Sequence, residues 1–370
     1  MSRFEINLAT PADDAALRQL LAATPMEGDI RLAFAREPSY FAASPIDGPF
    51  TQVVVARDLA KQRIIGMGSR AVFDAYVNGC QTPVGYLSGL RLAPEFRRRT
   101  WLLARGYRLF RHLHNDNRAA FYLTTIAADN QPAQAALLNQ RAGLPIYRPW
   151  GRFHTLTIAP QRPRRVGRDN LDIRAATAAD APAIADFLRR NGPRRQFFPA
   201  LEADEFAGRP TRFAGLVPDA ILLATVDEQL VGTLGLWDQR AYRQVVATAY
   251  SRRLRMLRPA YNMAAALRGR ARLPRVGESL NVRYATTFVT DEDCPDVAQA
   301  LLQAAAARLP QDSAEMLLVG LHESDPLLPA IRSSSGREYV TLLYLVYWPD
   351  AVPNLAALSE RTPYLELGCL

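Results

Sequence analysis

The chain has 370 residues, 49% of them hydrophobic and 22% charged, so it can bury the cores of two domains and is not a disordered polymer. Its 26 prolines and 21 glycines are ordinary numbers that exclude a collagen-like or low-complexity chain. The net charge is +9, and because Lys61 is the sole lysine, nearly all of the positive charge is arginine.

The first predicted elements belong to an internal repeat. Residues 4–21 and 171–188 are identical at seven of eighteen positions, and each segment reads as a short alternating strand followed by an amphipathic helix. Thr10 and Thr177 stand where an N-cap is expected, and Pro11 suits the first helical position. The repeat predicts two similar domains in tandem, at 1–159 and 171–370, joined by the polar, arginine-rich linker 160–170.

Later elements follow in a similar order in both copies. In the first copy, apolar alternation and turn residues predict helices at 100–115 and 131–142, and strands at 52–56, 63–77, 82–92, 120–127, 145–150 and 153–158. The second copy has predicted helices at 295–308 and 326–333, and predicted strands at 220–226, 229–236, 280–289, 315–321, 338–348 and 364–368.

An arginine-rich insertion at about 240–279 interrupts the second copy. Apolar residues recur among its arginines, which predicts helices with one buried stripe. Two interpretations of the arginines stay open: a structural, interdomain role, or a surface that binds a polyanion.

A basic loop in the first copy is the strongest candidate for a binding site. A predicted strand ends near Leu92, and Arg97, Arg98 and Arg99 precede the helix predicted at 100–115. A helix N-terminus offers unpaired N–H groups and the positive end of the helix dipole, and arginine forms strong bonds to phosphate. The loop therefore predicts a diphosphate site, with a merely solvated turn as the alternative.

This order of elements, together with residues 94–102, resembles the GCN5-related N-acetyltransferase superfamily in a tandem two-domain form. The resemblance implies an α/β fold in which each domain is a mixed, mostly antiparallel sheet flanked by helices. It also implies acetyl-CoA or another acyl-CoA as co-substrate. The positions that match the superfamily's CoA-binding loop are Arg97, Arg98, Arg99, Thr100, Trp101 and Leu102, and Thr100 and Leu102 replace its usual glycine and small residue.

The resemblance implies further contacts for the cofactor. Main-chain groups of Leu90 and Leu92, on the splayed fourth strand, would hold the thioester, and Asn130 would lie near the pantetheine arm. The superfamily's usual downstream tyrosine, which protonates the departing thiolate, is missing. Tyr147, in the following strand, is a possible replacement that lies outside the superfamily's pattern, and the favoured alternative is a half-buried strand tyrosine without a catalytic role.

A carboxylate is expected to accept the proton of the attacking amine. Glu27, in the turn after the first helix, is the first candidate for this base, and its alternative is a solvated loop glutamate. In the second copy the equivalent loop, 290–296, carries four carboxylates in place of arginines. Because these would repel a diphosphate, we expect the second copy to shape the acceptor pocket and to bind no CoA.

The leading hypothesis is therefore an N-acyltransferase that moves an acyl group, not an aminoacyl group, to a small-molecule or peptide amine. A catalytically silent CoA-sensing module and an aminoacyl-tRNA-dependent transferase of the same fold are the alternatives. We expect no metal, because Cys80, Cys294 and Cys369 are far apart and the four histidines lack metal-ligand spacing. We also expect no nucleic-acid partner, no membrane span and a cytoplasmic location.

Overall fold

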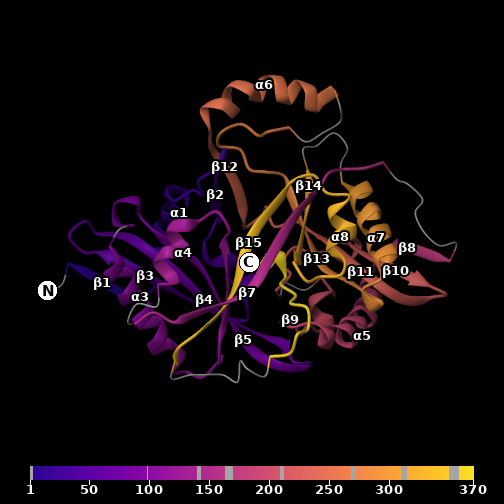
Figure 1. Ribbon diagram of the computed structural model, residues 1–370, viewed down its shortest axis with the longest axis horizontal. Coiled ribbons are helices and arrows are strands. Elements are labelled where there is room, and N and C mark those ends of the chain that lie inside the picture. The colour runs from indigo at the N-terminus through magenta and orange to yellow at the C-terminus, as the bar shows by residue number, and fades with distance from the viewer. Residues whose placement is uncertain are drawn as a thin grey trace.

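The computed structural model describes residues 3–97, 99–139, 143–162, 170–208, 212–267, 272–309, 315–349 and 358–370. Two lobes lie side by side, the first half of the chain on the left and the second half on the right (Figure 1). Long strands cross between them at the centre, and one helix, α6 (Arg252–Leu267), projects from the top of the molecule.

The first half contributes the elements β1 (Phe4–Leu8), α1 (Asp14–Ala23), β2 (Ile30–Ala35), α2 (Ser44–Asp47), β3 (Phe50–Asp58), β4 (Arg63–Val77), β5 (Cys80–Leu92), α3 (Thr100–His114), β6 (Tyr122–Ala127), α4 (Gln131–Leu137) and β7 (Ile146–Ile158). The second half contributes β8 (Leu171–Ala175), α5 (Ala181–Asn191), β9 (Phe198–Pro199), β10 (Ile221–Val226), β11 (Gln229–Trp237), β12 (Gln244–Tyr250), α6, β13 (Val282–Thr290), α7 (Pro295–Arg308), β14 (Met316–His322), α8 (Leu328–Arg332) and β15 (Glu338–Tyr347).

One 13-stranded sheet runs through both halves, and the two copies exchange their last strands. Along the sheet the order is β1-β3-β4-β5-β6-β15-β7-β14-β13-β11-β10-β8, and β9 pairs with β4. Thus β15, the last strand of the second copy, pairs with β6 of the first, while β7, the last strand of the first copy, pairs with β14 of the second. The mixed, mostly antiparallel sheet flanked by helices confirms the predicted fold class.

The internal repeat is visible in the caps of the 3-10 turns Pro11–Asp13 and Ala178–Asp180, which lead directly into α1 and α5. The Thr10 N–H donates to the Asp13 carboxylate at 2.8 Å, and the Thr177 N–H donates to the Asp180 carboxylate at 2.8 Å. Each threonine with its aspartate forms a capping box, which satisfies N–H groups that a helix leaves unpaired. The two N-caps predicted from the sequence are therefore confirmed.

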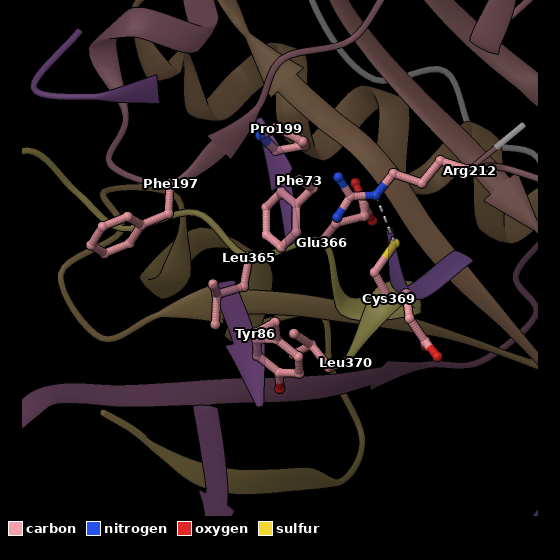
Figure 2. Close-up of a pocket in the computed structure, with 10 residues that line it drawn as sticks. Phe73, Tyr86, Phe197, Pro199, Arg212, Leu365, Glu366, Cys369 and Leu370 are labelled. Atoms are coloured by element: carbon pink, nitrogen blue, oxygen red, sulfur yellow. Dashed lines mark hydrogen bonds between the residues drawn. The ribbon is translucent and has the colours of Figure 1, made fainter. Parts of the chain in front are cut away.

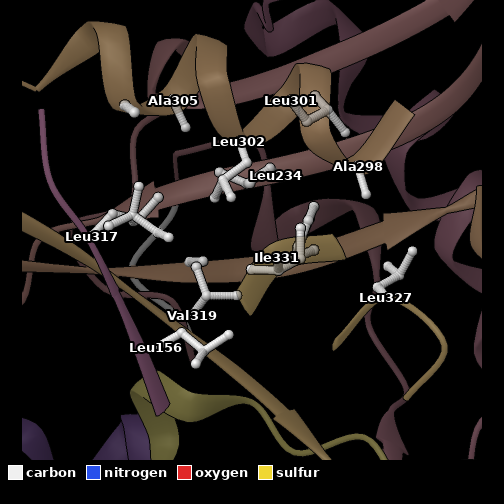
Figure 3. Packing of buried hydrophobic residues seen from close by; sticks show 14 of the residues in the cluster. Leu156, Leu234, Ala298, Leu301, Leu302, Ala305, Leu317, Val319, Leu327 and Ile331 are labelled. Carbon is white, nitrogen blue, oxygen red and sulfur yellow. The ribbon is translucent and has the colours of Figure 1, made fainter. Parts of the chain in front are cut away.

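Figure 3 shows how the second half buries its core. Small and branched residues of α7, such as Ala298 and Leu301, lie over Leu234 of β11 and Val319 of β14. Leu156 comes from β7, so a strand of the first copy completes this core. Each fully buried leucine contributes about 1.5–3 kcal/mol, which ties the exchanged strand firmly to its new sheet.

Three sequence predictions differ from the structure. Residues 145–150 and 153–158 form a single strand, β7, in which Gly151 adopts φ +100° beside a shift in the pairing with β15. The strand predicted at 364–368 is absent, and a short 3-10 turn occupies Leu367–Cys369. Of the helix predicted at 131–142, α4 ends at Leu137, and residues 140–142 lie outside the described part of the chain.

The insertion at 240–279 also differs from its prediction. Its first part is a strand, β12, which pairs antiparallel with β2 of the first half in a separate two-stranded sheet. Gln244 fastens this bridge, because its side chain exchanges hydrogen bonds with the Glu37 main chain at 3.0 Å in both directions. The helix α6 follows, but its apolar residues Met256, Met263 and Leu267 are exposed instead of buried.

Candidate functional site

The strands β5 and β6 separate soon after they pair. Their parallel pairing covers two positions, Gly85 with Tyr122 and Tyr86 with Leu123. At the point of separation the Thr124 hydroxyl donates to the Leu87 carbonyl at 2.7 Å. Beyond this point the two strands are no longer paired, and β5 continues to Leu92, from which the basic loop leads to α3.

A bulge in β5 lies in the part of the strand that is no longer paired with β6. The register between β4 and β5 shifts between Met67 and Ser69, and Gly89, in the bulge, adopts φ +64°. A side chain is strained in that conformation, so glycine suits the position. Of the residues predicted from the sequence, Leu90 lies in the bulge and Leu92 ends the strand, and both are half-buried.

The basic loop reaches α3 through a 3-10 turn at Pro94–Phe96. Phe96 is buried as its anchor, Arg97 is exposed, and the Arg99 guanidinium lies over the Phe96 ring at 5.4 Å. Thr100 begins α3 and is exposed. Two cations thus stand at the positive end of a 15-residue helix, while Arg98 lies outside the described residues.

The next two residues of the predicted loop point elsewhere. The Trp101 indole packs edge-on against Phe4 of β1, with ring centroids 5.2 Å apart. Leu102 is 2% exposed within the core, and its N–H donates to the Arg99 carbonyl at 3.0 Å. The structure therefore places the Trp101 indole against β1 and leaves the Leu102 N–H satisfied by the loop itself.

Asn130 and Tyr147 both have structural partners. Asn130 caps α4, because its side-chain oxygen accepts the Ala133 N–H at 3.2 Å. The Tyr147 hydroxyl, on β7, shares a hydrogen bond with Tyr107 of α3. Burial raises the pKa of Tyr147 well above its ordinary value, so this phenol holds its proton at neutral pH.

Glu27 lies at the surface. Its side chain is 63% exposed and forms an ion pair with Arg31 Nε at 2.8 Å. An exposed pair of this kind contributes little binding energy, and nothing in the described structure encloses the carboxylate. The first sequence candidate for the base is thus a solvated residue next to β2.

A small pocket, with room for about one water molecule, lies between the two halves (Figure 2). Side chains of both halves form its wall, and the final residues of the chain form one side of it. The lining residues are Asp47, Phe73, Tyr86, Phe197, Pro199, Arg212, Leu365, Glu366, Cys369 and Leu370. Tyr86 places the pocket beside β5, three residues before the bulge at Gly89.

Glu366 is the most unusual group in this pocket. Its carboxylate accepts the Thr287 N–H at 3.1 Å and the Tyr364 hydroxyl at 3.0 Å. Burial raises the pKa of Glu366 to about 7. Nearby, the Arg212 Nε contacts the Cys369 sulfur at 3.5 Å, and burial raises the pKa of that thiol to about 11. A carboxyl group that titrates near neutrality can accept and release a proton.

The second copy repeats the separated strands. There β13 pairs with β14 at Val282 with Met316 through Tyr284 with Leu318, and the register with β11 shifts before Gly235. Aligning the two bulges places Thr287, at φ +48°, in the position of Gly89. In this copy the Glu366 carboxylate accepts the hydrogen bond of the N–H at the bulge. A side chain of the protein itself therefore takes the position beside this N–H.

The acidic loop of the second copy is also engaged internally. Asp291 pairs with Arg190 at 2.9 Å, and Asp293 pairs with Arg195 of the same α5 region. Arg195 pairs in addition with Asp325 at 2.7 Å. These ion pairs therefore tie the loop after β13 to α5 and the turn that follows it.

Sequence reasoning missed several polar contacts that form within each half. The Tyr40 hydroxyl lies 3.2 Å from Ser69 Oγ, and Arg36 pairs with Asp47 at 2.8 Å. Arg243 donates to the Gly368 carbonyl at 2.8 Å. No motif marks these residues, because packing between segments that are distant in the sequence brings them together. The rise in the pKa of Glu366 likewise depends on burial, which the sequence pattern does not report.

Neither family models nor curated proteins match this chain. Among solved structures, a Saccharomyces cerevisiae N-myristoyltransferase with bound myristoyl-CoA matches 99% of this chain and 90% of its own, with a TM-score of 0.59 and 12% identity. A GCN5-related N-acetyltransferase from Sphaerobacter thermophilus matches 100% of this chain and 99% of its own, with a TM-score of 0.56 and 15% identity. The chain has the fold of these acyltransferases. At such low identity the likeness shows the fold alone, and its coverage of nearly the whole chain agrees with two copies of that fold in tandem.

Among the described residues no helix is long and apolar enough to cross a membrane. The same residues contain no cluster of three His, Cys, Asp or Glu side chains placed to hold a metal ion.

Proposed function

We propose that this protein is an acyl-CoA-dependent N-acyltransferase whose first half holds the cofactor. The observation that carries the proposal is the separation of β5 from β6 after two paired positions, together with Arg97 and Arg99 at the N-terminus of α3, the helix that follows β5. The same fold holds myristoyl-CoA in the yeast enzyme. The transferred group is acetyl or a longer acyl chain, and a thiol-release assay with acetyl-CoA and myristoyl-CoA distinguishes the two.

The described residues suit the parts of an acyl-CoA. Arg97 and Arg99 would bind the diphosphate together with the N–H groups that begin α3, since charge-assisted bonds to phosphate are strong. The pantetheine arm would extend between the separated strands. A main-chain N–H at the Gly89 bulge would donate to the thioester carbonyl, where negative charge develops as the amine attacks. The second copy supports this last role, because Glu366 already bonds the equivalent N–H of Thr287.

Transfer then proceeds by direct attack. The nitrogen of a neutral amine adds to the thioester carbonyl carbon, the C–N bond forms and the C–S bond breaks, so the products are an amide and CoA thiol. We assign Glu366, in place of Glu27, as acceptor of the amine proton, because it lies buried in the pocket beside β5 and titrates near neutrality. Tyr147, the sequence candidate for protonating the thiolate, is a weaker acid than a free phenol because burial raises its pKa. The departing thiolate would instead take the proton that Glu366 received from the amine.

A thiol-release assay tests this proposal. Acetyl-CoA and myristoyl-CoA are offered with a panel of small amines and N-terminal peptides, and free CoA is measured. We expect turnover with at least one pair, and we expect Glu366→Gln to lower kcat by about a hundredfold, as is typical when a general base is lost, with an unchanged KM for acyl-CoA.

Glu27→Gln is the matched control, since it removes a carboxylate of the same kind from an exposed ion pair. We expect it to keep its activity. Loss of activity in Glu27→Gln with full activity in Glu366→Gln would identify Glu27, in the turn after α1, as the residue that accepts the amine proton. CoA binding without release of thiol from any pair would leave only the CoA-sensing alternative.

A further inference from the structure

The helix α6 is attached to the molecule by its polar side. Asn262 anchors it, because its side-chain oxygen accepts the Leu273 N–H at 2.8 Å and its amide donates to the Leu273 carbonyl at 3.1 Å. One turn earlier, the Arg258 guanidinium lies 5.6 Å from the centre of the Tyr250 ring. Leu254, Arg258, Asn262 and Ala265 are the partly or fully buried positions on this side.

The opposite side of α6 is apolar and faces solvent. Met256 is 80% exposed, Met263 is 67% exposed and Leu267 is 84% exposed. At about 100° per residue, these three side chains lie within about 40° of one another and point away from the side that contacts the body. A surface helix of a monomeric protein normally has the reverse arrangement, with its apolar stripe against the core. The exposed stripe on this projecting helix therefore requires a partner outside the chain (Figure 1).

Positive charge borders the stripe. Arg252, Arg253 and Arg255 are exposed in the first turn of α6, and no carboxylate among the described residues forms an ion pair with them. The charged residues of the surrounding sequence are all positive, since ten arginines and no acidic residue lie between Asp238 and Glu278. The partner must therefore offer both negative charge and an apolar layer beneath it.

An anionic lipid surface has both properties. Helices of this kind lie in the plane of the membrane, with apolar residues below the headgroups and arginines at the phosphates. A second copy of the chain would bring two positively charged helices together, which is unfavourable. RNA would satisfy the arginines, but methionine and leucine provide no aromatic face for its bases.

We propose that α6 docks this protein on anionic membranes, with Met256, Met263 and Leu267 inserted among the acyl chains and Arg252, Arg253 and Arg255 on the lipid phosphates. The proposal is independent of the acyltransferase function. It explains both the outward apolar stripe and the arginines beside it, which an interdomain role of the insertion does not.

Flotation of the full chain with vesicles tests the docking surface. Vesicles of phosphatidylcholine alone are compared with vesicles that also contain phosphatidylglycerol. We expect the protein to float with the anionic vesicles at least tenfold more than with the neutral ones, and we expect salt to reduce this binding, since each arginine near an anionic surface contributes about a fivefold gain. Equal recovery with both kinds of vesicle, or none with either, would overturn the proposal.

Two variants separate the apolar and the charged contributions. The triple change Met256→Ser, Met263→Ser and Leu267→Ser, and the triple change Arg252→Gln, Arg253→Gln and Arg255→Gln, should each lower binding at least tenfold while leaving the melting temperature unchanged. The control Leu59→Ser with Val217→Ser removes exposed apolar side chains elsewhere and should bind like the parent chain.

Two other results would replace the lipid with a different partner. A dimer at micromolar concentration that the serine variant abolishes, without vesicle binding, would assign the stripe to a second copy. Salt-dependent retention of RNA that the glutamine variant abolishes, without vesicle binding, would assign the arginines to a nucleic acid.

Discussion

Glu366 shows how one buried side chain connects the two halves of the molecule. Its carboxylate satisfies the Thr287 N–H in the second copy and lines a pocket whose wall includes Phe73 and Tyr86 of the first. Burial disfavours the charged form, which is why its pKa rises from 4.5 to about 7. The same shift that suits a proton acceptor must therefore make the stability of the protein depend on pH.

The direction of that dependence follows from the two pKa values. Between about pH 4.5 and 7 the unfolded chain ionises at this position while the folded protein keeps its proton, so rising pH favours unfolding. The group's stabilising contribution is fully present below pH 4.5, and about 3 kcal/mol is lost by pH 7, at about 1.4 kcal/mol for each pKa unit.

We therefore predict that Glu366→Gln removes this slope. The free energy of unfolding of the parent chain and of the variant is measured by urea denaturation from pH 4.5 to 8. The contributions of the other titrating groups cancel in the difference between the two. The variant should gain relative stability as pH rises. A difference that stays constant across this range would show that Glu366 titrates normally.

At the scale of elements, the bulge in β5 lies just after the point where this strand separates from β6. Gly89 adopts φ +64°, and a Cβ there would lie 3.4 Å from Ser69 Oγ. A side chain at this position is therefore disfavoured more by the backbone conformation than by a lack of space. The sequence predicted β5 and α3 closely, because alternation and capping act locally. It did not reveal the bulge, since glycine in a strand fits several geometries.

We predict opposite effects for two glycine-to-alanine changes. Gly89→Ala should lower the free energy of unfolding by about 1–2 kcal/mol through left-handed strain, and it should raise the KM for acyl-CoA because the bulge shifts. Gly106→Ala, within α3 with nothing within 4 Å of the added Cβ, should raise stability by up to about 1 kcal/mol. Urea denaturation and acyl-CoA kinetics measure both. If Gly89→Ala stabilises as Gly106→Ala does, the bulge imposes no strain.

The failures of sequence prediction share one physical cause. Residues 364–368 alternate like a strand, yet the Tyr364 N–H bonds to Gln196 and the Glu366 carboxylate bonds to Thr287, so tertiary contacts replace a ladder. In the same way, apolar residues in α6 predicted a buried stripe that faces outward instead. Local patterns identify elements, but they do not report which partner an element meets.

At the scale of the whole molecule, strand exchange makes the two copies one unit with unequal roles. The repeat at Thr10 and Thr177 was visible in the sequence, whereas the crossing of β7 and β15 was not, because pairing across the halves leaves no local signal. In the first copy a basic loop stands beside open strands. In the second, an acidic loop is tied to α5 and Glu366 fills the bulge. The molecule should therefore bind one CoA, not two.

Calorimetric titration with CoA tests this claim most directly. We predict one site per chain, an affinity at least tenfold weaker in the variant Arg97→Ala with Arg99→Ala, and an unchanged affinity in the control Arg253→Ala with Arg255→Ala, which removes the same charge from α6. Two sites per chain, no binding, or equal losses in the two variants would contradict the account.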